Sequence, residues 1–269
     1  MMSEDAKRSF GQKVREARRE GGWSRVAVMA WSKAVHPLVL WLQRTAPERW
    51  NPIVVAAARI SRHPVVHVIG DSHTLMLAGA YPFRVTWMGA ATAYNLGKEG
   101  SSTRSLEKLT KALAHVRRDN DIVLLVLGEV DSRIHVFNQF KKLSGAETIE
   151  QLIARTIDRY GAVILGLKAQ GYRVVVHSVP ATPYQDNIYG VEYYADDETR
   201  ACIVSEFNKQ LSAWCSANAT EYLDMYSLVS DERGFIRREL TTDGTHLDRS
   251  ALPIYGDWVR HNVSPRGAK

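Results

Sequence analysis

Cysteine is scarce in this sequence, which limits the ways in which the chain could be cross-linked. Only two cysteines, Cys202 and Cys215, occur in 269 residues. No CxxC pair or Cys/His spacing accompanies them, so neither a disulfide framework nor a structural zinc site is expected. Both cysteines fit on one amphipathic helix, where we expect them to act as small apolar residues.

Long apolar runs are also missing. Residues 1–22 are highly charged and contain no apolar core of the kind that a secretory signal needs. Residues 23–42 are rich in Val, Ala, Leu and Trp, but charged residues and a proline interrupt them. A membrane-spanning helix needs about 20 mostly apolar residues. We therefore expect a cytoplasmic protein without a spanning helix, with peripheral membrane contact as an alternative.

The positive charge is unevenly distributed. Residues 1–62 contain 12 Lys and Arg against 5 Asp and Glu, a net of +7, and because the whole chain carries +6, residues 63–269 carry −1. The basic segment also holds four tryptophans, Trp23, Trp31, Trp41 and Trp50. Such a mixture suits an interfacial helix on an anionic membrane, and docking onto the domain or a protein partner is the favoured alternative. Nucleic acid is not expected, because no recognised binding motif accompanies the charge.

Strand-like and helix-like segments alternate from residue 63 onward. This alternation divides the chain into a basic, helical N-terminal extension, residues 1–62, and a domain, residues 63–269. Strands are predicted at 65–69, 83–88, 121–127, 172–179 and 222–225. Helices are predicted at 101–118, 148–170, 197–218 and 249–261, with a loop at 181–196. Five strands separated by helices predict an α/β domain of three layers, in which helices cover both faces of a parallel sheet.

Unusual residues fall where the predicted strands end. GDSH (70–73) follows the first strand, Gly89 the second and GEVD (128–131) the third, while DGTH (243–246) precedes the last helix. The carboxyl ends of parallel strands meet at one edge of a sheet, where α/β proteins bind ligands. We therefore expect these four motifs to meet in one site.

The residue types in these motifs fit nucleophilic catalysis. A serine hydroxyl is a poor nucleophile unless an imidazole removes its proton, and that imidazole needs an acceptor to fix its tautomer. Asp243 and His246 are close enough in sequence to pair directly. Ser72 lies at a strand-to-helix turn, where its hydroxyl and N–H can both face the crevice.

At these motifs the sequence resembles the SGNH hydrolase superfamily, also called the GDSL family. The resemblance spans residues 65–261 and implies a flavodoxin-like fold, hydrolysis of an acyl or acetyl ester, and neither a cofactor nor a metal. It also implies that Ser72 is the nucleophile and His246 its base, oriented by Asp243. The N–H groups of Ser72 and Gly89 would then form an oxyanion hole.

One motif departs from the family pattern. Where the family has an asparagine in GxND, this chain has Val130, which cannot donate a side-chain hydrogen bond. Arg133 or Asn95 would have to replace that donor, and nothing in the sequence chooses between them. His73 and Glu129 are further candidates for substrate contact. The GEVDSR loop resembles a variant associated with bacterial surface polysaccharides, so a carbohydrate ester or another small ester is the expected substrate class.

Three other functions remain open on the sequence alone. A metal-dependent phosphoesterase could use Asp71, His73, Asp243 and His246 as ligands. A catalytically silent binding domain would explain the loss of the oxyanion asparagine at position 130. An acyltransferase linked to polysaccharide modification could use the same serine with a sugar hydroxyl as acceptor.

Overall fold

The computed structural model describes residues 47–183, 187–188, 191–192 and 195–263. They form a five-stranded parallel sheet in the order β2-β1-β3-β4-β7, which is the flavodoxin-like order 2-1-3-4-5. The predicted α/β fold with its parallel sheet is therefore confirmed. The strands are β1 (Val66–Gly70), β2 (Phe83–Trp87), β3 (Ile122–Val126), β4 (Arg173–His177) and β7 (Glu221–Leu223).

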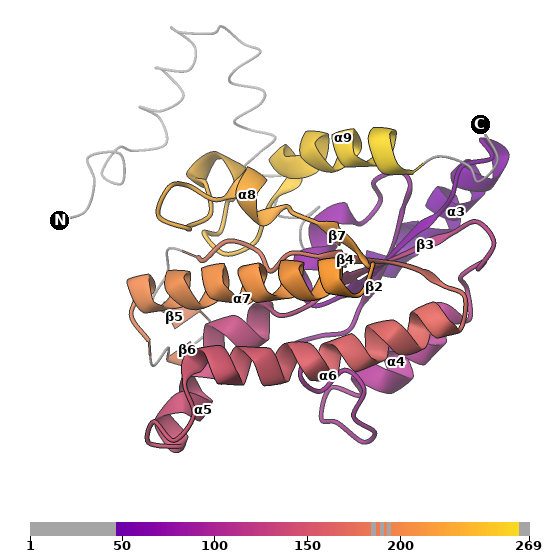
Figure 1. Cartoon of the computed structure of the whole chain (residues 1–269). Coiled ribbons are helices and arrows are strands. Elements are labelled where there is room, and N and C mark those ends of the chain that lie inside the picture. Colours follow the sequence, from indigo (N-terminus) through magenta and orange to yellow (C-terminus); the bar gives the residue numbers. More distant parts are fainter. Residues whose placement is uncertain (1–46, 184–186, 189–190, 193–194, 264–269) are drawn as a thin grey trace, which may run out of the picture. The chain divides into compact units, whose positions relative to one another are not determined.

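Helices cover both faces of this sheet (Figure 1). Apolar side chains of α4, α6 and α7 pack with Ile69 in one core cluster, and those of α8 and α9 pack with Val68 in the other. The central strands β1 and β3 are buried at every residue, because neither face meets water. The helices that follow β2 in the chain are α4 (Ser105–Leu113), α5 (Val136–Lys142), α6 (Ile149–Ala169), α7 (Asp197–Ala217), α8 (Tyr226–Val229) and α9 (Leu252–Asn262).

Local sequence signals set the ends of the longest helices. Thr148 caps α6 through a capping box with Gln151, the arrangement that satisfies two free N–H groups at a helix start. Gly171 follows the helix with a φ of 87°, a left-handed conformation that favours glycine. The predicted helix at 148–170 is therefore confirmed to within a residue at each end.

Three expectations about local structure need correction. The helix predicted at 101–118 begins only at Ser105, because Arg104 adopts a left-handed conformation with a φ of 52°, and it already ends at Leu113. The predicted loop at 181–196 contains a short antiparallel pair, β5 (Asn187–Ile188) and β6 (Val191–Glu192). Both cysteines lie on α7 as expected, but only Cys215 is buried, whereas Cys202 is exposed.

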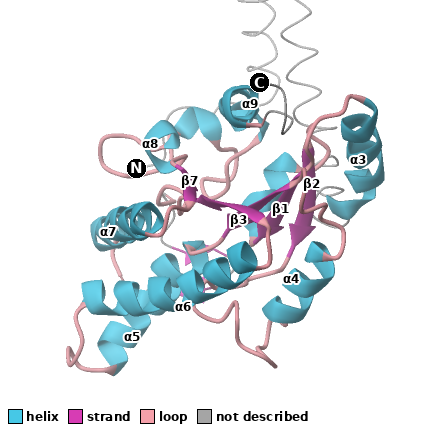
Figure 2. Cartoon of the chain, turned by 45° about the vertical axis from the view of Figure 1, so that its right-hand side comes forward, coloured by secondary structure: helices cyan, strands magenta, loops and turns pink. Residues whose placement is uncertain are grey.

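A helix that precedes the predicted domain packs on the edge of the sheet. This helix, α3 (Asn51–Ile60), lies beside the edge strand β2 (Figure 2). The buried Asn51 amide donates to the Val85 carbonyl over 2.8 Å and accepts from the Val85 N–H over 2.9 Å. Residues 51–60 are thus tied to the domain. The division at residue 62 stays a prediction for residues 1–46, which lie outside the described part.

The described helices are too short or too polar to cross a bilayer. None of them combines the length and the mean hydropathy of a membrane-spanning segment.

Candidate active site

Ser72 is the first residue of a 3₁₀ turn, η3 (Ser72–Leu77), which directly follows β1. The buried Asp71 side chain shapes this turn, because its Oδ1 accepts the N–H of His73 over 2.9 Å. The Asp71 carbonyl also accepts the Thr74 hydroxyl over 2.8 Å. Burial raises the pKa of Asp71 well above its usual value. Asp71 therefore holds the turn in place, and Ser72 remains partly exposed beside it.

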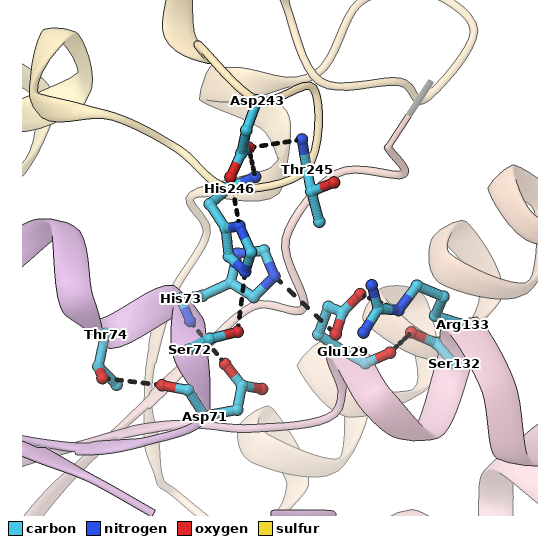
Figure 3. A network of polar contacts seen from close by, with 10 residues as sticks. All are labelled: Asp71, Ser72, His73, Thr74, Glu129, Ser132, Arg133, Asp243, Thr245 and His246. Atoms are coloured by element: carbon cyan, nitrogen blue, oxygen red, sulfur yellow. Dashed lines mark hydrogen bonds and ion pairs between the residues drawn. The ribbon is translucent and has the colours of Figure 1, made fainter. Parts of the chain in front are cut away.

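The structure brings Ser72, His246 and Asp243 together in one chain of hydrogen bonds (Figure 3). The Ser72 Oγ lies 2.9 Å from Nε2 of His246, and Nδ1 of His246 lies 2.8 Å from Oδ2 of Asp243. If Nδ1 carries the ring proton and donates it to the carboxylate, Nε2 is left to accept from the hydroxyl. The arrangement has the connectivity of a Ser-His-Asp triad.

The backbone of the DGTH loop fixes the carboxylate of this triad. Oδ1 of Asp243 accepts the N–H groups of Thr245 and His246 over 2.9 and 2.8 Å. Burial by itself raises the pKa of Asp243, but the hydrogen bonds from the His246 ring and from these amides outweigh burial and hold the pKa below its usual range. Asp243 is therefore ionised near neutral pH, as an acceptor for the imidazole must be.

Gly89 follows β2 on the same edge of the sheet as Ser72. It has a φ of 78°, and the preceding Met88 N–H donates to the Gly70 carbonyl over 2.8 Å. The N–H groups of Ser72 and Gly89 have no hydrogen-bond acceptor among the described residues. Both donors are thus available to an incoming oxygen.

Glu129, Arg133 and His73 form a second layer next to the triad. The His73 ring lies against the His246 ring, with centroids 4.8 Å apart, and its Nε2 is 3.9 Å from Glu129 Oε2. Arg133 Nε pairs with Glu129 Oε1 over 2.7 Å. Burial is the largest cause that lowers the pKa of His73 well below its usual value, followed by the charges of His246 and Arg133. His73 is therefore a neutral neighbour of the imidazole in the triad.

Val130 stands where the family pattern has an oxyanion-hole donor, and the two candidate replacements, Arg133 and Asn95, lie at different distances from the triad. Val130 is buried, with 7% of its surface exposed. Arg133 lies at the border of the site, where it is engaged by Glu129. Asn95 lines a separate cavity whose walls include neither Ser72 nor His246. The geometry thus keeps Arg133 near the triad and places Asn95 away from it.

The alternative metal-ligand set does not converge. Asp71 is turned toward the N–H of His73, and Asp243 toward the ring and backbone of His246. In the described part of the chain, no three His, Cys, Asp or Glu side chains are placed to share one ion. The geometry gives the phosphoesterase interpretation no support.

Two further residues, neither of them predicted from the sequence, support the site. Thr241 Oγ1 accepts the Gly244 N–H over 2.9 Å and so closes the DGTH turn. Lys108 Nζ donates to the Met88 carbonyl over 2.9 Å, which puts a positive charge beside Gly89. A threonine two residues before the DxxH aspartate is a weak sequence signal for the first. One of the two lysines of an amphipathic helix gives no sequence signal for the role of Lys108.

The comparisons with known proteins bear on the fold. No protein-family model matches the chain, and no curated protein matches its sequence. A GDSL-like lipase from Bacteroides thetaiotaomicron VPI-5482 aligns with a TM-score of 0.52 at 15% identity, over 80% of this chain and 97% of that one. A Bacteroides fragilis protein provisionally described as an acylhydrolase aligns with a TM-score of 0.50 at 15% identity, over 79% of this chain and 93% of that one. The chain has the fold of the SGNH/GDSL hydrolases.

Proposed function

We propose that this protein is a serine ester hydrolase of the SGNH type, which removes an acyl or acetyl group from a small ester. The observation that carries the proposal is the continuous contact from Ser72 Oγ through the His246 ring to the Asp243 carboxylate. These groups come from segments 174 residues apart, so sequence proximity does not account for their meeting. The fold is one on which such chemistry occurs.

In the proposed reaction, Ser72 attacks the ester carbonyl while His246 takes the hydroxyl proton on Nε2. The tetrahedral oxyanion accepts hydrogen bonds from the N–H groups of Ser72 and Gly89. His246 then returns the proton to the leaving alcohol, which leaves an acyl group on Ser72. Water, deprotonated by the same imidazole, attacks that acyl ester and releases the acid together with the free serine.

The missing asparagine is the main chemical difficulty for this proposal. Removal of one oxyanion donor costs about 10²–10³ in rate where it has been measured. Two backbone donors remain, and the positive charge of Lys108 lies beside Gly89, whereas the charge of Arg133 is offset by Glu129. We propose that the charge of Lys108 compensates in part for the donor that Val130 cannot supply.

The finer proposal is that the acyl group is carried by a carbohydrate. Its support is the resemblance of the GEVDSR loop to the variant associated with bacterial surface polysaccharides. We also propose a cytoplasmic location with peripheral membrane contact through residues 1–62. The net charge of +7 on that segment supports the second point, since basic segments are attracted to anionic lipid.

Serine-directed labelling provides the first test. A fluorophosphonate probe should label the native protein on Ser72, and p-nitrophenyl acetate should be hydrolysed at a rate above that of buffer. A catalytically silent domain, favoured by the buried Val130 side chain, would neither be labelled nor turn over this ester. Addition of sugar acceptors to an active protein would then separate transfer of the acyl group from hydrolysis.

A further inference from the structure

The part of the chain that the structure describes holds a cavity of about 380 Å³ whose walls include none of Ser72, Asp243 and His246. Its volume is within the range of small-ligand sites. Three segments line it: the loop after β2, one side of α5 with the π-helical turn before it, and the first turns of α6. The wall residues that matter here are Tyr94, Asn95, Asp131, Gln139, Lys142 and Arg155. None of them belongs to the triad.

The buried Asp131 carboxylate fixes the position of one wall of this cavity. Its side chain is 1% exposed and accepts the N–H groups of Ala93 and Tyr94 over 2.7 and 3.2 Å. These bonds hold the loop after β2 against residues 131–135, which form a π-helical turn. Such turns often mark functional sites. GEVD (128–131) was expected to lie with the other motifs in the active site, yet its last residue lines this cavity.

The polar groups in the wall are mostly donors. The Tyr94 hydroxyl accepts from Arg159 over 3.1 Å, so its own proton is free to be donated to a ligand. The amides of Asn95 and Gln139 add donors and acceptors on two other sides. Val136 and Leu152 supply apolar surface between them. This mixture of hydroxyl, amide and apolar groups suits a hydroxyl-rich ring better than an apolar ligand.

The uncompensated charge in the wall is positive. Arg155 is paired with Glu147 over 2.7 Å, and the Asp131 carboxylate is satisfied by two backbone amides. Lys142 is exposed and forms no ion pair with the described residues. An anionic group on the ligand would therefore find a partner at Lys142.

We propose that this cavity binds an acidic sugar, a pyranose that carries a carboxylate, with Lys142 as partner of the carboxylate and Tyr94, Asn95 and Gln139 as partners of the hydroxyls. The site is separate from the triad, so the proposal goes beyond ester hydrolysis and does not depend on Ser72. Because Asp131 ties the cavity to the loop that carries Gly89, a bound sugar would also steady that loop.

The test is a titration of the full chain, followed by the shifts of its backbone amides in NMR spectra. D-glucuronate is the probe, D-glucose its neutral match, and inorganic phosphate a simple anion. Glucuronate should shift the amides of Tyr94, Asn95 and Gln139 saturably, with an affinity about tenfold above that of glucose. The same titration of Ser72→Ala should give the same affinity, which separates this proposal from the proposed hydrolysis.

Two lysine variants form a matched pair for this titration. Lys142→Gln should weaken glucuronate binding about fivefold to tenfold. Lys141→Gln should leave it unchanged, because that side chain lies over the Phe137 ring and outside the cavity. The proposal is overturned if glucuronate shifts none of these amides, if phosphate binds there as tightly, or if the two lysine variants behave alike.

Discussion

Two His–Asp pairs lie in different parts of this molecule, and their surroundings set them apart. His246 pairs with Asp243 over 2.8 Å, and His67, on β1, pairs with Asp121 over 3.2 Å. In both pairs burial by itself raises the pKa of the aspartate, and hydrogen bonds outweigh burial and hold it below its usual range. Pairing of an imidazole with a carboxylate therefore does not by itself distinguish a reactive site.

The difference lies in what else each pair contacts. Arg59 binds both carboxylate oxygens of Asp121 over 2.7 Å, and Nδ1 of the buried His67 has no hydrogen-bond partner within the described residues. The second ring nitrogen of His246 instead meets Ser72 Oγ, and 20% of the His246 side chain is exposed. In the His67–Asp121 pair, Arg59 therefore neutralises the carboxylate and the imidazole is buried. In the Asp243–His246 pair, the imidazole lies beside the Ser72 hydroxyl and is accessible to solvent.

The largest effect is expected when the alcohol is removed. Ser72→Ala should reduce kcat/KM for p-nitrophenyl acetate by about 10⁴-fold or more. The free energy of unfolding should change little, since the side chain is small and lies at the start of a turn. Steady-state kinetics and urea unfolding of the same samples measure both quantities. Comparable rates in the two proteins would remove Ser72 from the mechanism.

Asp243→Asn should give the next largest effect on turnover. The amide would favour the wrong imidazole tautomer, and where such a change has been measured it costs about 10⁴-fold. We expect a loss of about 10³–10⁴ in kcat with the fold retained. Circular dichroism and kinetics at neutral pH provide the check. A loss below about tenfold would show that His246 needs no partner here.

Val130→Asn would restore the family's side-chain donor. If that donor limits the rate, kcat should rise by about tenfold, less than the 10²–10³ lost in well-packed sites because a polar group enters a buried position. Val130→Ala is the control for packing. An unchanged rate in Val130→Asn would mean that the positive charge of Lys108 already compensates for the missing donor.

Asp121→Asn should separate the two pairs most directly, because it acts on stability and not on turnover. An uncompensated Arg59 guanidinium would remain, and we expect unfolding to become easier by about 2 kcal/mol. That figure allows for the exposure of 26% of the Arg59 side chain. Hydrolysis per folded molecule should stay at the native value. A large kinetic loss with unchanged stability would reverse the assignment of the two pairs.

The smallest effect concerns acid sensitivity. Burial lowers the pKa of His67, so below about pH 6.5 the unfolded chain binds a proton there that the folded chain does not. The free energy of unfolding should therefore fall as the pH drops below that value. In urea unfolding between about pH 5 and 8, the range in which histidines usually titrate, His67→Gln should make the free energy of unfolding depend less on pH. His63→Gln, at an exposed position, serves as the control and should leave this dependence unchanged.

Much of the fold could be predicted because its strands are short apolar runs with clear ends. β3, for instance, is apolar at every residue and stops before Gly128, a signal that is entirely local. Ser72 likewise follows the end of β1, whereas Asp243 and His246 lie inside a loop and are expected only from the resemblance of DGTH to the family motif. The start of α4 could not, because Arg104 takes a left-handed conformation that no side-chain pattern requires.

Long-range packing accounts for what the sequence concealed. Asn95 was a reasonable candidate for the oxyanion donor by its spacing from Gly89, yet the amides next to it are drawn to Asp131 and turn that loop toward the other cavity. Lys108 reaches the Met88 carbonyl from α4, a contact that depends on how that helix lies on the sheet. Neither contact could be predicted from the amino-acid sequence.

The Asn51 side chain has a consequence for any shortened version of this protein. β2 is the last strand on its side of the sheet, and open strand edges invite pairing with other molecules. The Asn51 side chain bonds both the carbonyl and the N–H of Val85, as a neighbouring strand would at that residue. These two backbone groups are therefore not available to a strand of another molecule. A chain that begins at residue 63 would lose this guard, and it should self-associate through β2 at concentrations where the longer chain stays dispersed.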